Sequence, residues 1–302
     1  GQIPLVFRIS AVLRPNVSIR RILHRRMGAT LGLVEEAKRT SEPNEYWDKH
    51  AKRHKVESVT PINWKTTPKK EDSVRFVCIS DTHSLHAKIA EIPPGDVLIH
   101  AGDFSNTGQP SDVASFSTFL GQLPHKHKVV IAGNHDLTFD ADSYPETWKR
   151  FRHKEMHDVT KTRALLKNCI YLEDSSVALY GYRIYGSPWQ PRFCDWAFNV
   201  DRGSKLLQLW RKIPSETDIL ITHGPPIGHG DLCQGGHRAG CVDLLFEVEE
   251  RVKPLVHVFG HIHEAYGVTT NGVTTFINAS TCTYRYKPNN LPIVFDLPIN
   301  SS

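Results

Sequence analysis

Five short segments made almost entirely of apolar residues set the strongest limit on the fold of this chain. They are VRFVCIS at 74–80, DVLIHAG at 96–102, KVVIAG at 128–133, DILITHG at 218–224 and LVHVFGH at 255–261. Runs of this length are typical of strands buried on both faces, and each one leads into a polar loop. A sheet buried on both faces needs helices to cover it, so the sequence predicts an α/β fold.

Amphipathic helices and hairpins are predicted around these strands. In PSDVASFSTFLGQL, residues 110–123, the apolar positions recur with helical spacing, and Ser111 is the expected N-cap. Further helices are expected around 145–168, over 204–213 and over 241–252. Two hairpins are expected to turn at Gly181 and at Asn271-Gly272, and PIVFDL near the C-terminus is expected to close the sheet.

The N-terminal region differs in composition from the rest of the chain. Residues 1–34 hold six arginines and no acidic residue, and residues 35–72 mix nine basic and eight acidic residues with little apolar periodicity. We therefore expect a basic, partly disordered arm and linker over 1–72 that adds little to the core, and one folded domain over 73–302. The arginine-rich start resembles a mitochondrial transit peptide, and the alternative is translated leader sequence ahead of an initiator at Met27.

Charge and cysteine content narrow the classes of function. The formal net charge is +5, but the residues after position 34 together carry −1, which leaves no basic face for a nucleic-acid duplex. Small anionic substrates remain open. The six cysteines lack paired spacing, which favours a reducing compartment, so we expect a cytoplasmic protein, or a mitochondrial one if the arm is a transit peptide. No stretch of the sequence approaches the roughly 20 apolar residues of a membrane span.

Polar residues gather at the points where the five strands end. They are Asp81, His83, Asp103, Asn134, His135, Asp136, His223, His261 and His263. In an α/β sheet the carboxyl ends of the strands form one rim, where residues far apart in sequence converge. Alternation along extended chain predicts that Asp81 and His83 face one point, as do His261 and His263. Glycines near these residues are expected to let the backbone approach closely, at positions 102, 133, 224 and 260.

The residue types at this rim are those of a metal site. Imidazole and carboxylate together suit manganese, iron, zinc or cobalt, and seven ligands are too many for one ion. Two ions that share Asp103 would fit. Histidines outside the rim are interpreted as structural, namely His86, His125, His127, His153, His157 and His257.

The order of these motifs resembles a known family. D-x-H, G-D, G-N-H-D, a lone H before a glycine, and G-H-x-H form the pattern of the calcineurin-like metallophosphoesterases, over about residues 74–296. The segments RFVCISDTHS, VVIAGNHDLTFD, DILITHGPP, HVFGHIHE and INASTCT look like the animal metallophosphoesterase-domain-containing proteins, relatives of class III cyclic-nucleotide phosphodiesterases. The resemblance implies a metallophosphoesterase domain over 73–302, built as a four-layer α/β/β/α sandwich with a two-metal site.

The resemblance also implies a role for each residue at the rim. The first ion would be held by Asp81, His83, Asp103 and His263, and the second by Asp103, Asn134, His223 and His261. His135 matches the family's catalytic histidine and would protonate the leaving oxygen, while a water or hydroxide bridging the ions would be the nucleophile. Asp136 is expected to lie outside the ligands and to fix a neighbouring histidine by a hydrogen bond.

The predicted activity is hydrolysis of small phosphodiesters, such as cyclic nucleotides, with two divalent ions, manganese first and iron, zinc or cobalt as alternatives. A phosphomonoesterase or protein phosphatase is the alternative enzyme, but GDFSNTG lacks the arginine that the protein Ser/Thr phosphatases carry there. A nucleotide-binding or scaffolding protein with little turnover is the alternative without catalysis, and His261 disfavours it because it completes the ligand set.

The sequence leaves the substrate-binding residues and the oligomeric state open. Trp189 could stack on a nucleobase, and a tryptophan of the core is an equally good interpretation. His229 and His237 lie in the glycine-rich loop GHGDLCQGGHRAG and could touch substrate, although a solvated loop is the stronger interpretation.

Overall fold

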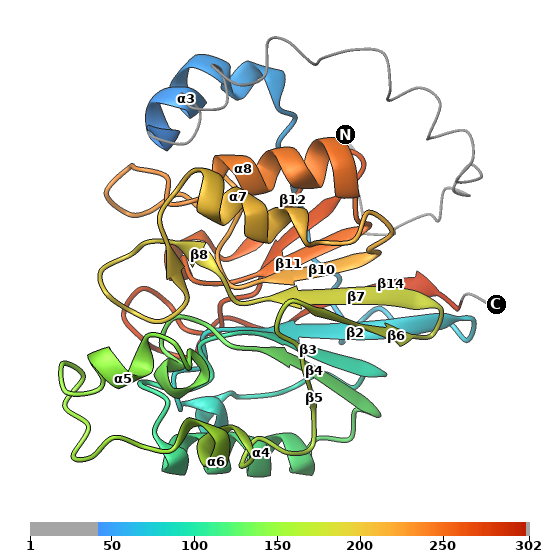
Figure 1. Cartoon of the computed structure of the whole chain (residues 1–302). Helices are drawn as coiled ribbons and strands as arrows, with labels where there is room; N and C mark the ends of the chain where they lie inside the picture. Colours follow the sequence, from blue (N-terminus) through green and yellow to red (C-terminus); the bar gives the residue numbers. More distant parts are fainter. Residues whose placement is uncertain (1–41, 300–302) are drawn as a thin grey trace.

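Two β-sheets packed face to face form the centre of the molecule (Figure 1). The structure is a computed structural model that describes residues 42–299. The smaller sheet has the strand order β14-β2-β3-β4-β5, with β2 to β5 parallel and β14 antiparallel at the edge. Its strands are β2 (Ser73–Ile79), β3 (Val97–Ala101), β4 (His127–Ile131), β5 (Ile170–Tyr171) and β14 (Ile293–Pro298).

The larger sheet has the order β1-β12-β13-β11-β10-β7-β6, with parallel pairing in the middle and antiparallel strands toward both edges. Its strands are β1 (Glu57–Val59), β6 (Ser175–Leu179), β7 (Tyr182–Ser187), β10 (Ile219–Thr222), β11 (Val256–Phe259), β12 (Gly267–Thr270) and β13 (Thr275–Asn278). The expected strands are therefore confirmed, as are the hairpins β6–β7 and β12–β13. A short parallel pair, β8 (Gln190–Pro191) and β9 (Asn199–Val200), lies outside both sheets.

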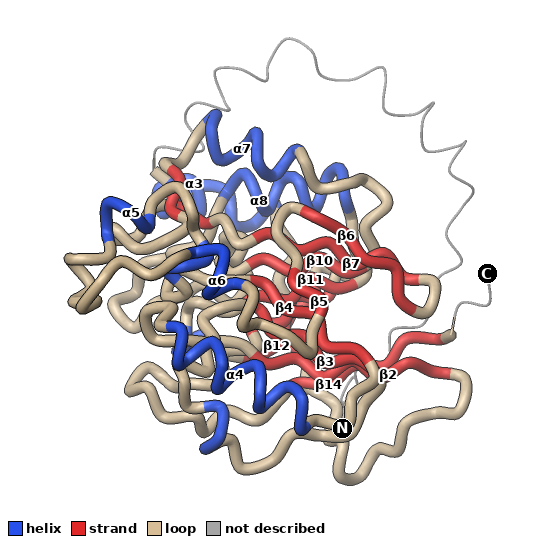
Figure 2. The backbone as a smooth tube through the Cα atoms, turned by 60° about the horizontal axis from the view of Figure 1, so that its bottom comes forward, coloured by secondary structure: helices blue, strands red, loops and turns tan. Residues whose placement is uncertain are grey.

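Helices cover the outer faces of the two sheets, which gives the expected four-layer α/β/β/α sandwich (Figures 1 and 2). On the smaller sheet lie α4 (Pro110–Gln122) and α6 (Val159–Arg163), and on the larger lie α7 (Ser204–Arg211) and α8 (Val242–Phe246), which continues as the π-helix η4 (Glu247–Val252). Gln109 rather than Ser111 is the N-cap of α4, so that expectation was wrong. Between residues 42 and 299, no helix has the length and apolar composition needed to cross a membrane.

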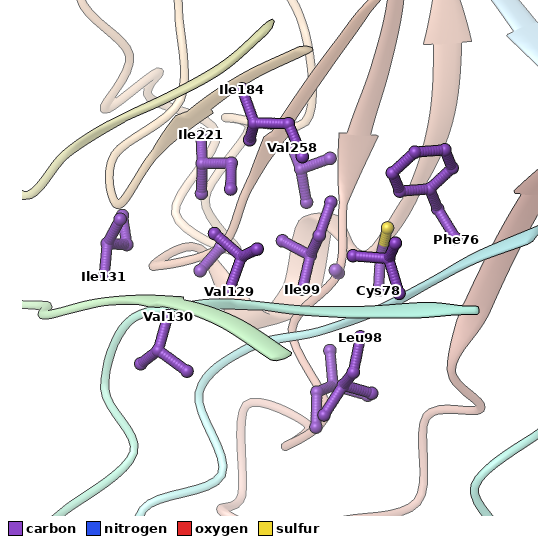
Figure 3. Close-up of a cluster of buried hydrophobic side chains, with 14 of the residues drawn as sticks. Phe76, Cys78, Leu98, Ile99, Val129, Val130, Ile131, Ile184, Ile221 and Val258 are labelled. Atoms are coloured by element: carbon purple, nitrogen blue, oxygen red, sulfur yellow. The ribbon is translucent and has the colours of Figure 1, made fainter. Parts of the chain in front are cut away.

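Side chains from the two sheets meet in the layer between them (Figure 3). Ile99 and Val129 of the smaller sheet point toward Ile221 and Val258 of the larger, whereas Leu98 points to the opposite side. All five side chains are fully buried. Burial of one such side chain is worth about 1.5–3 kcal/mol, so the packed layer fixes the strands whose ends carry the site.

The helix expected around residues 145–168 is split in two. The structure has the short α5 (Tyr144–Thr147), then a loop, then α6. The loop folds around the Tyr144 hydroxyl, which accepts a hydrogen bond from the backbone N–H of His157 at 3.1 Å and bonds to His153 Nδ1 at 2.8 Å. These polar contacts hold the chain in a turn that helical periodicity does not reveal.

Residues 42–72 pack on the domain. Helix α3 (Pro43–His50) buries Trp47 against Ile227, Val242 and Leu245, and β1 pairs with β12 as the edge strand of the larger sheet. The expectation that the arm adds little to the core is therefore wrong for this part of it. Residues 1–41, with the transit-peptide and Met27 interpretations, lie outside the described residues.

Candidate metal centre

The predicted site residues meet at the carboxyl ends of β2, β3, β4, β10 and β11, at the left of Figure 1. Backbone hydrogen bonds tie these ends together. The N–H of Asp81 donates to the carbonyl of Gly102 at 2.9 Å, and the N–H of His83 donates to that of Asp103 at 3.0 Å. The N–H of Gly260 donates to the carbonyl of His223 at 3.0 Å. The rim is therefore a bonded framework that carries side chains from both sheets.

The backbone at this rim is left-handed at several predicted ligands. The φ angles are 51° at Asp81, 43° at His83, 57° at Asp103 and 68° at His261. Non-glycine residues seldom adopt this conformation, which costs on the order of 1–3 kcal/mol each and is concentrated at functional sites. The argument from alternation along extended chain was wrong, because sharp turns rather than extended backbone bring these side chains together.

Asp81, His83 and His263 form the first group of potential ligands. Their ligand atoms lie within 4.8 Å of one another. The Nε2 atoms of His83 and His263 are 3.1 Å apart, and His263 Nε2 lies 3.3 Å from Asp81 Oδ1. The Nδ1–H of His263 donates to the Thr283 carbonyl at 3.2 Å, which leaves Nε2 as the nitrogen with a free lone pair.

Asp103, His223 and His261 form the second group, again within 4.8 Å. His223 Nε2 lies 3.3 Å from Asp103 Oδ2 and 2.9 Å from Asn134 Oδ1, so the predicted amide ligand belongs to this group. The Nδ1–H of His223 donates to the Ala101 carbonyl at 2.9 Å and aims Nε2 at the group. His261 and His263, although two positions apart, thus serve different groups.

Asp103 lies between the two groups. Its Oδ2 is 3.3 Å from Nε2 of His223 in the second group and 3.9 Å from Nε2 of His83 in the first. One carboxylate can therefore reach ligand atoms of both groups. This is the arrangement that two ions sharing a bridging carboxylate require.

Electrostatics keep the two carboxylates ionised. Burial raises the pKa of Asp81, but His263 and His223 outweigh it and hold that pKa below its ordinary value. Burial likewise opposes ionisation of Asp103, whose pKa His223 and His135 hold well below the ordinary value. In return, burial would lower the pKa of His223, but Asp103 raises it to about 9. Two buried negative charges in a histidine-rich site suit a divalent cation.

The backbone passes close to both carboxylates, at glycines. A Cβ at Gly260 would lie 2.0 Å from Asp81 Oδ2, and one at Gly133 would lie 2.3 Å from Asp103 Oδ1. Glycine is therefore required where the backbone passes the carboxylates. The same holds at Gly102, beside His223. Gly224 follows His223 in the chain, and a Cβ there would meet Gln190 Cβ at 3.3 Å, so glycine is less strictly required at this position. Carboxylate, imidazole and amide donors in this cradle match two divalent ions such as manganese, iron, zinc or cobalt.

Asp136 holds the backbone of the rim rather than a histidine, so the expected partner was wrong. Its carboxylate accepts from the backbone N–H groups of Asp103 at 2.9 Å and Gly133 at 2.8 Å. It also accepts from the N–H and hydroxyl of Ser105 at 3.0 and 2.6 Å. Asp136 therefore fixes the left-handed turn from which the Asp103 side chain projects.

His135 lies beside both groups and is only partly buried. A ligand atom of its ring lies within 4.8 Å of ligand atoms of His83 and Asp103. Its Nδ1–H donates to the Asn106 carbonyl at 2.9 Å, and its ring stacks on Trp196 with 4.0 Å between centroids. These contacts fix the ring and leave Nε2 as the nitrogen that can carry a transferable proton.

Sequence reasoning missed several residues that contact the site. They are Trp196 on His135, Phe193 on His261, Tyr286 on His83 and His263, and Ser280, whose hydroxyl donates to Asp81 Oδ2 at 3.0 Å. All four lie outside the named strands and helices, and Ser280 forms an isolated β-bridge with Ser80. The nearest signal was INASTCT, which includes Ser280 and supported the family resemblance without a role for the serine.

The other candidates lie away from the predicted ligands. The Trp189 Nε1–H donates to Asp174 Oδ2 at 3.0 Å, and the ring packs against the core, which favours the structural interpretation. His229 is buried and stacks on Phe276 with 3.7 Å between centroids. His237 is exposed.

Known proteins are similar to this chain in sequence. Residues 74–265 match the family described as Calcineurin-like phosphoesterase. The chain is similar to Metallophosphoesterase domain-containing protein 1 of Homo sapiens, with 51% identity over 251 residues that cover 80% of this chain and 76% of the relative. It is also similar to a UPF0046 protein of Caenorhabditis elegans, with 47% identity over 266 residues that cover 86% of this chain and 94% of the relative. A second UPF0046 protein of that organism is 44% identical over 275 residues, which cover 86% of this chain and 69% of that relative.

Proposed function

Because this chain belongs to the calcineurin-like phosphoesterase family of hydrolases, we propose that it is a phosphodiesterase that cleaves small phosphodiesters, such as cyclic nucleotides, with two divalent ions. Manganese is the first candidate metal. The observation that carries the proposal is the pair of ligand groups with Asp103 between them. A single ion would leave one group of buried ionisable side chains without a counter-ion.

The chain's own residues divide the work at the site. Asp81, His83 and His263 would hold the first ion, and Asn134, His223 and His261 the second, with Asp103 shared. When bound, two such ions make water a potent nucleophile at neutral pH and neutralise charge on the phosphoryl oxygens. Asp136 and Ser280 hold Asp103 and Asp81 in position for this task.

His135 is proposed as the proton donor to the leaving oxygen. Since its Nδ1–H is engaged by the Asn106 carbonyl, the protonated ring would donate from Nε2. Stacking on Trp196 keeps the ring in one orientation. His135 acts at the leaving group and is not needed to hold either ion.

The charge of the Asp103 loop favours diesters over monoesters. Phe104 and Ser105 are buried, the Ser105 hydroxyl is used by Asp136, and no cation occurs in GDFSNTG. A monoester dianion would lack a bidentate clamp from this loop, whereas a diester monoanion needs less neutralisation.

The test is a substrate panel on the full chain reconstituted with manganese. Cyclic nucleotides, linear diesters and matched monoesters are compared by kcat/KM, after correction for their intrinsic reactivities. We expect diesters to be favoured. A clear preference for monoesters would move the assignment to a phosphatase, and no turnover with full metal occupancy would favour a nucleotide-binding protein.

A further inference from the structure

A cavity of about 630 Å³ lies beside the candidate metal centre. It is lined by Leu232, Cys233, Gln234, Gly236, Glu264, Thr283, Tyr284 and Arg285, and we call it the Tyr284 pocket. Two of these residues adjoin the first ligand group directly. Glu264 follows His263 in the chain, and the Thr283 carbonyl accepts the His263 Nδ1–H at 3.2 Å. The pocket therefore borders the first group through the residues that flank and hold the His263 ring.

Hydrogen-bonded turns form the two walls of the pocket. In one wall, the Cys233 N–H donates to the His237 carbonyl at 2.9 Å, and the Gln234 N–H donates to Glu264 Oε1 at 2.9 Å. In the other wall, the Thr283 N–H donates to the Lys287 carbonyl at 2.8 Å. The walls are thus built before any ligand arrives, which lowers the entropic cost of binding.

The second wall carries two exposed tyrosines. Tyr284 lines the pocket and is 58% exposed. Tyr286 is held at a φ of 54° by its N–H bond to the Thr283 carbonyl, and its ring lies 4.8 Å from the His83 ring and 5.0 Å from the His263 ring. Exposed aromatic rings on a strained turn beside polar ligands are typical of a binding surface.

Leu232 and Arg285 give the pocket an apolar surface and a positively charged group. Leu232 adds apolar surface from the opposite wall and is 47% exposed. Among residues 42–299, no acidic side chain forms an ion pair with Arg285, and the Glu264 carboxylate is bonded to the Gln234 N–H. A free guanidinium can stack on a planar group and bind its oxygen atoms. The combination suits a planar ring that carries polar atoms.

We propose that the Tyr284 pocket binds the ester group that the phosphodiester retains after cleavage, and that it selects a nucleoside or aryl group over an alkyl group. This inference rests on the proposed function. The leaving group is assigned to His135, which contacts His83 and Asp103, whereas the pocket adjoins His263. A volume of about 630 Å³ lies within the usual range of small-molecule sites and accommodates a nucleoside.

Three diesters with the same leaving group test this assignment. Methyl 4-nitrophenyl phosphate, bis(4-nitrophenyl) phosphate and the 4-nitrophenyl ester of thymidine 5′-monophosphate all release 4-nitrophenolate and differ only in the retained group. For Tyr284→Ala, we expect kcat/KM to fall about 10-fold on the thymidine ester, less on the aryl ester, and within about 2-fold of wild type on the methyl ester. Arg285→Gln should show the same order.

A matched control and a second readout keep the outcomes distinct. Val273→Ala changes another exposed apolar residue, 63% exposed, in the β12–β13 turn at the opposite end of the sheet, and should leave all three rates unchanged. The second readout is calorimetric binding of thymidine 5′-monophosphate to the metal-loaded full chain, which Tyr284→Ala should weaken about 10-fold.

Each result decides one of the two proposals. Equal losses on all three diesters, or unchanged nucleotide binding in Tyr284→Ala, would overturn the pocket assignment. If the wild-type chain cleaves none of the diesters with both ions bound, the proposed function fails. The binding readout then still supports the pocket if the Tyr284 variant binds the nucleotide more weakly, and rejects it if binding is unchanged.

Discussion

Two sets of buried histidines lie in or near the two sheets and differ in what their ring nitrogens face. In the candidate metal centre, Nε2 of His223 faces Asp103 and Asn134, and Nε2 of His83 faces Nε2 of His263. Three other buried histidines bond to threonine hydroxyls instead, namely His100 to Thr82, His257 to Thr222 and His229 to Thr269, at 2.7–2.9 Å.

Burial does not separate the two sets. It lowers the pKa of His261 and of His257 to about 3, although we assign one to the metal centre and the other to the framework. The two sets differ because, in the metal centre only, several potential metal-ligand atoms converge on one point. Each framework histidine bonds to a hydroxyl through one ring nitrogen, and its other ring nitrogen is buried without a partner among residues 42–299. Histidines that share a point with carboxylates instead form a cation site. The predictions below test this distinction.

The largest expected effect comes from His261→Gly. This change removes one ligand of the second group and leaves Asp81, His83 and His263 intact. We expect one manganese ion to remain and kcat to fall on the order of 10³-fold, because an ion contributes several kcal/mol of charge stabilisation. Turnover close to wild type with two ions per chain would refute the assignment of His261.

His135→Ala should separate the proton donor from the ligands. We expect both ions to remain and the rate to fall on the order of 10²- to 10⁴-fold for alkyl leaving groups. The loss should be smaller for 4-nitrophenolate, which leaves without a proton. Equal losses for the two leaving groups would mean that His135 positions the site and does not donate a proton.

The smallest effect is expected at a framework histidine. His257→Gln should keep both ions and the wild-type kcat, and should lower the free energy of unfolding at pH 7 by about 1 kcal/mol through its weakened bond to Thr222. An activity loss comparable to that of His261→Gly would remove the distinction between the two sets.

The pH dependence of stability gives His257 a second signature. Because burial lowers its native pKa to about 3, the native state excludes a proton that the unfolded chain binds below about pH 6.5. Neutral His257 therefore costs the native state nothing above about pH 6.5. As the pH falls from there toward 3, the free energy of unfolding drops by up to about 1.4 kcal/mol per pH unit. Denaturant unfolding of His257→Gln should show a correspondingly shallower loss, and parallel curves would contradict the neutral buried state.

The sequence predicted correctly that the site residues converge, but it did not predict the backbone conformation at each of them. Strand ends placed Asp81 and Asp103 at one rim because parallel strands of one sheet share a carboxyl edge, and His223 joins them from the end of β10 in the other sheet. The left-handed turns at Asp81 and Asp103 depend on contacts with Ser280 and Asp136, which come from other segments of the chain. Hydrophobic periodicity carries no information about such contacts.

The contacts made by the loops and by the arm could not be predicted either, because they too depend on segments far apart in the sequence. Tyr286 contacts the metal centre through a short turn with no periodic pattern. Trp47 packs where Gly228 leaves room for its ring, since a Cβ there would lie 2.0 Å from Trp47 Cη2. That fit depends on two segments 181 positions apart, and neither segment reveals it alone.

Metal content tests the central claim most directly. The full chain is loaded with manganese, freed of unbound metal, and measured by mass spectrometry beside Asp103→Asn and His257→Gln. We predict two ions per chain in the wild type and in His257→Gln, and fewer than two in Asp103→Asn, because Asp103 is the carboxylate between the groups. One ion or none in the folded wild type, or two firmly bound ions in Asp103→Asn, would contradict a centre joined by Asp103.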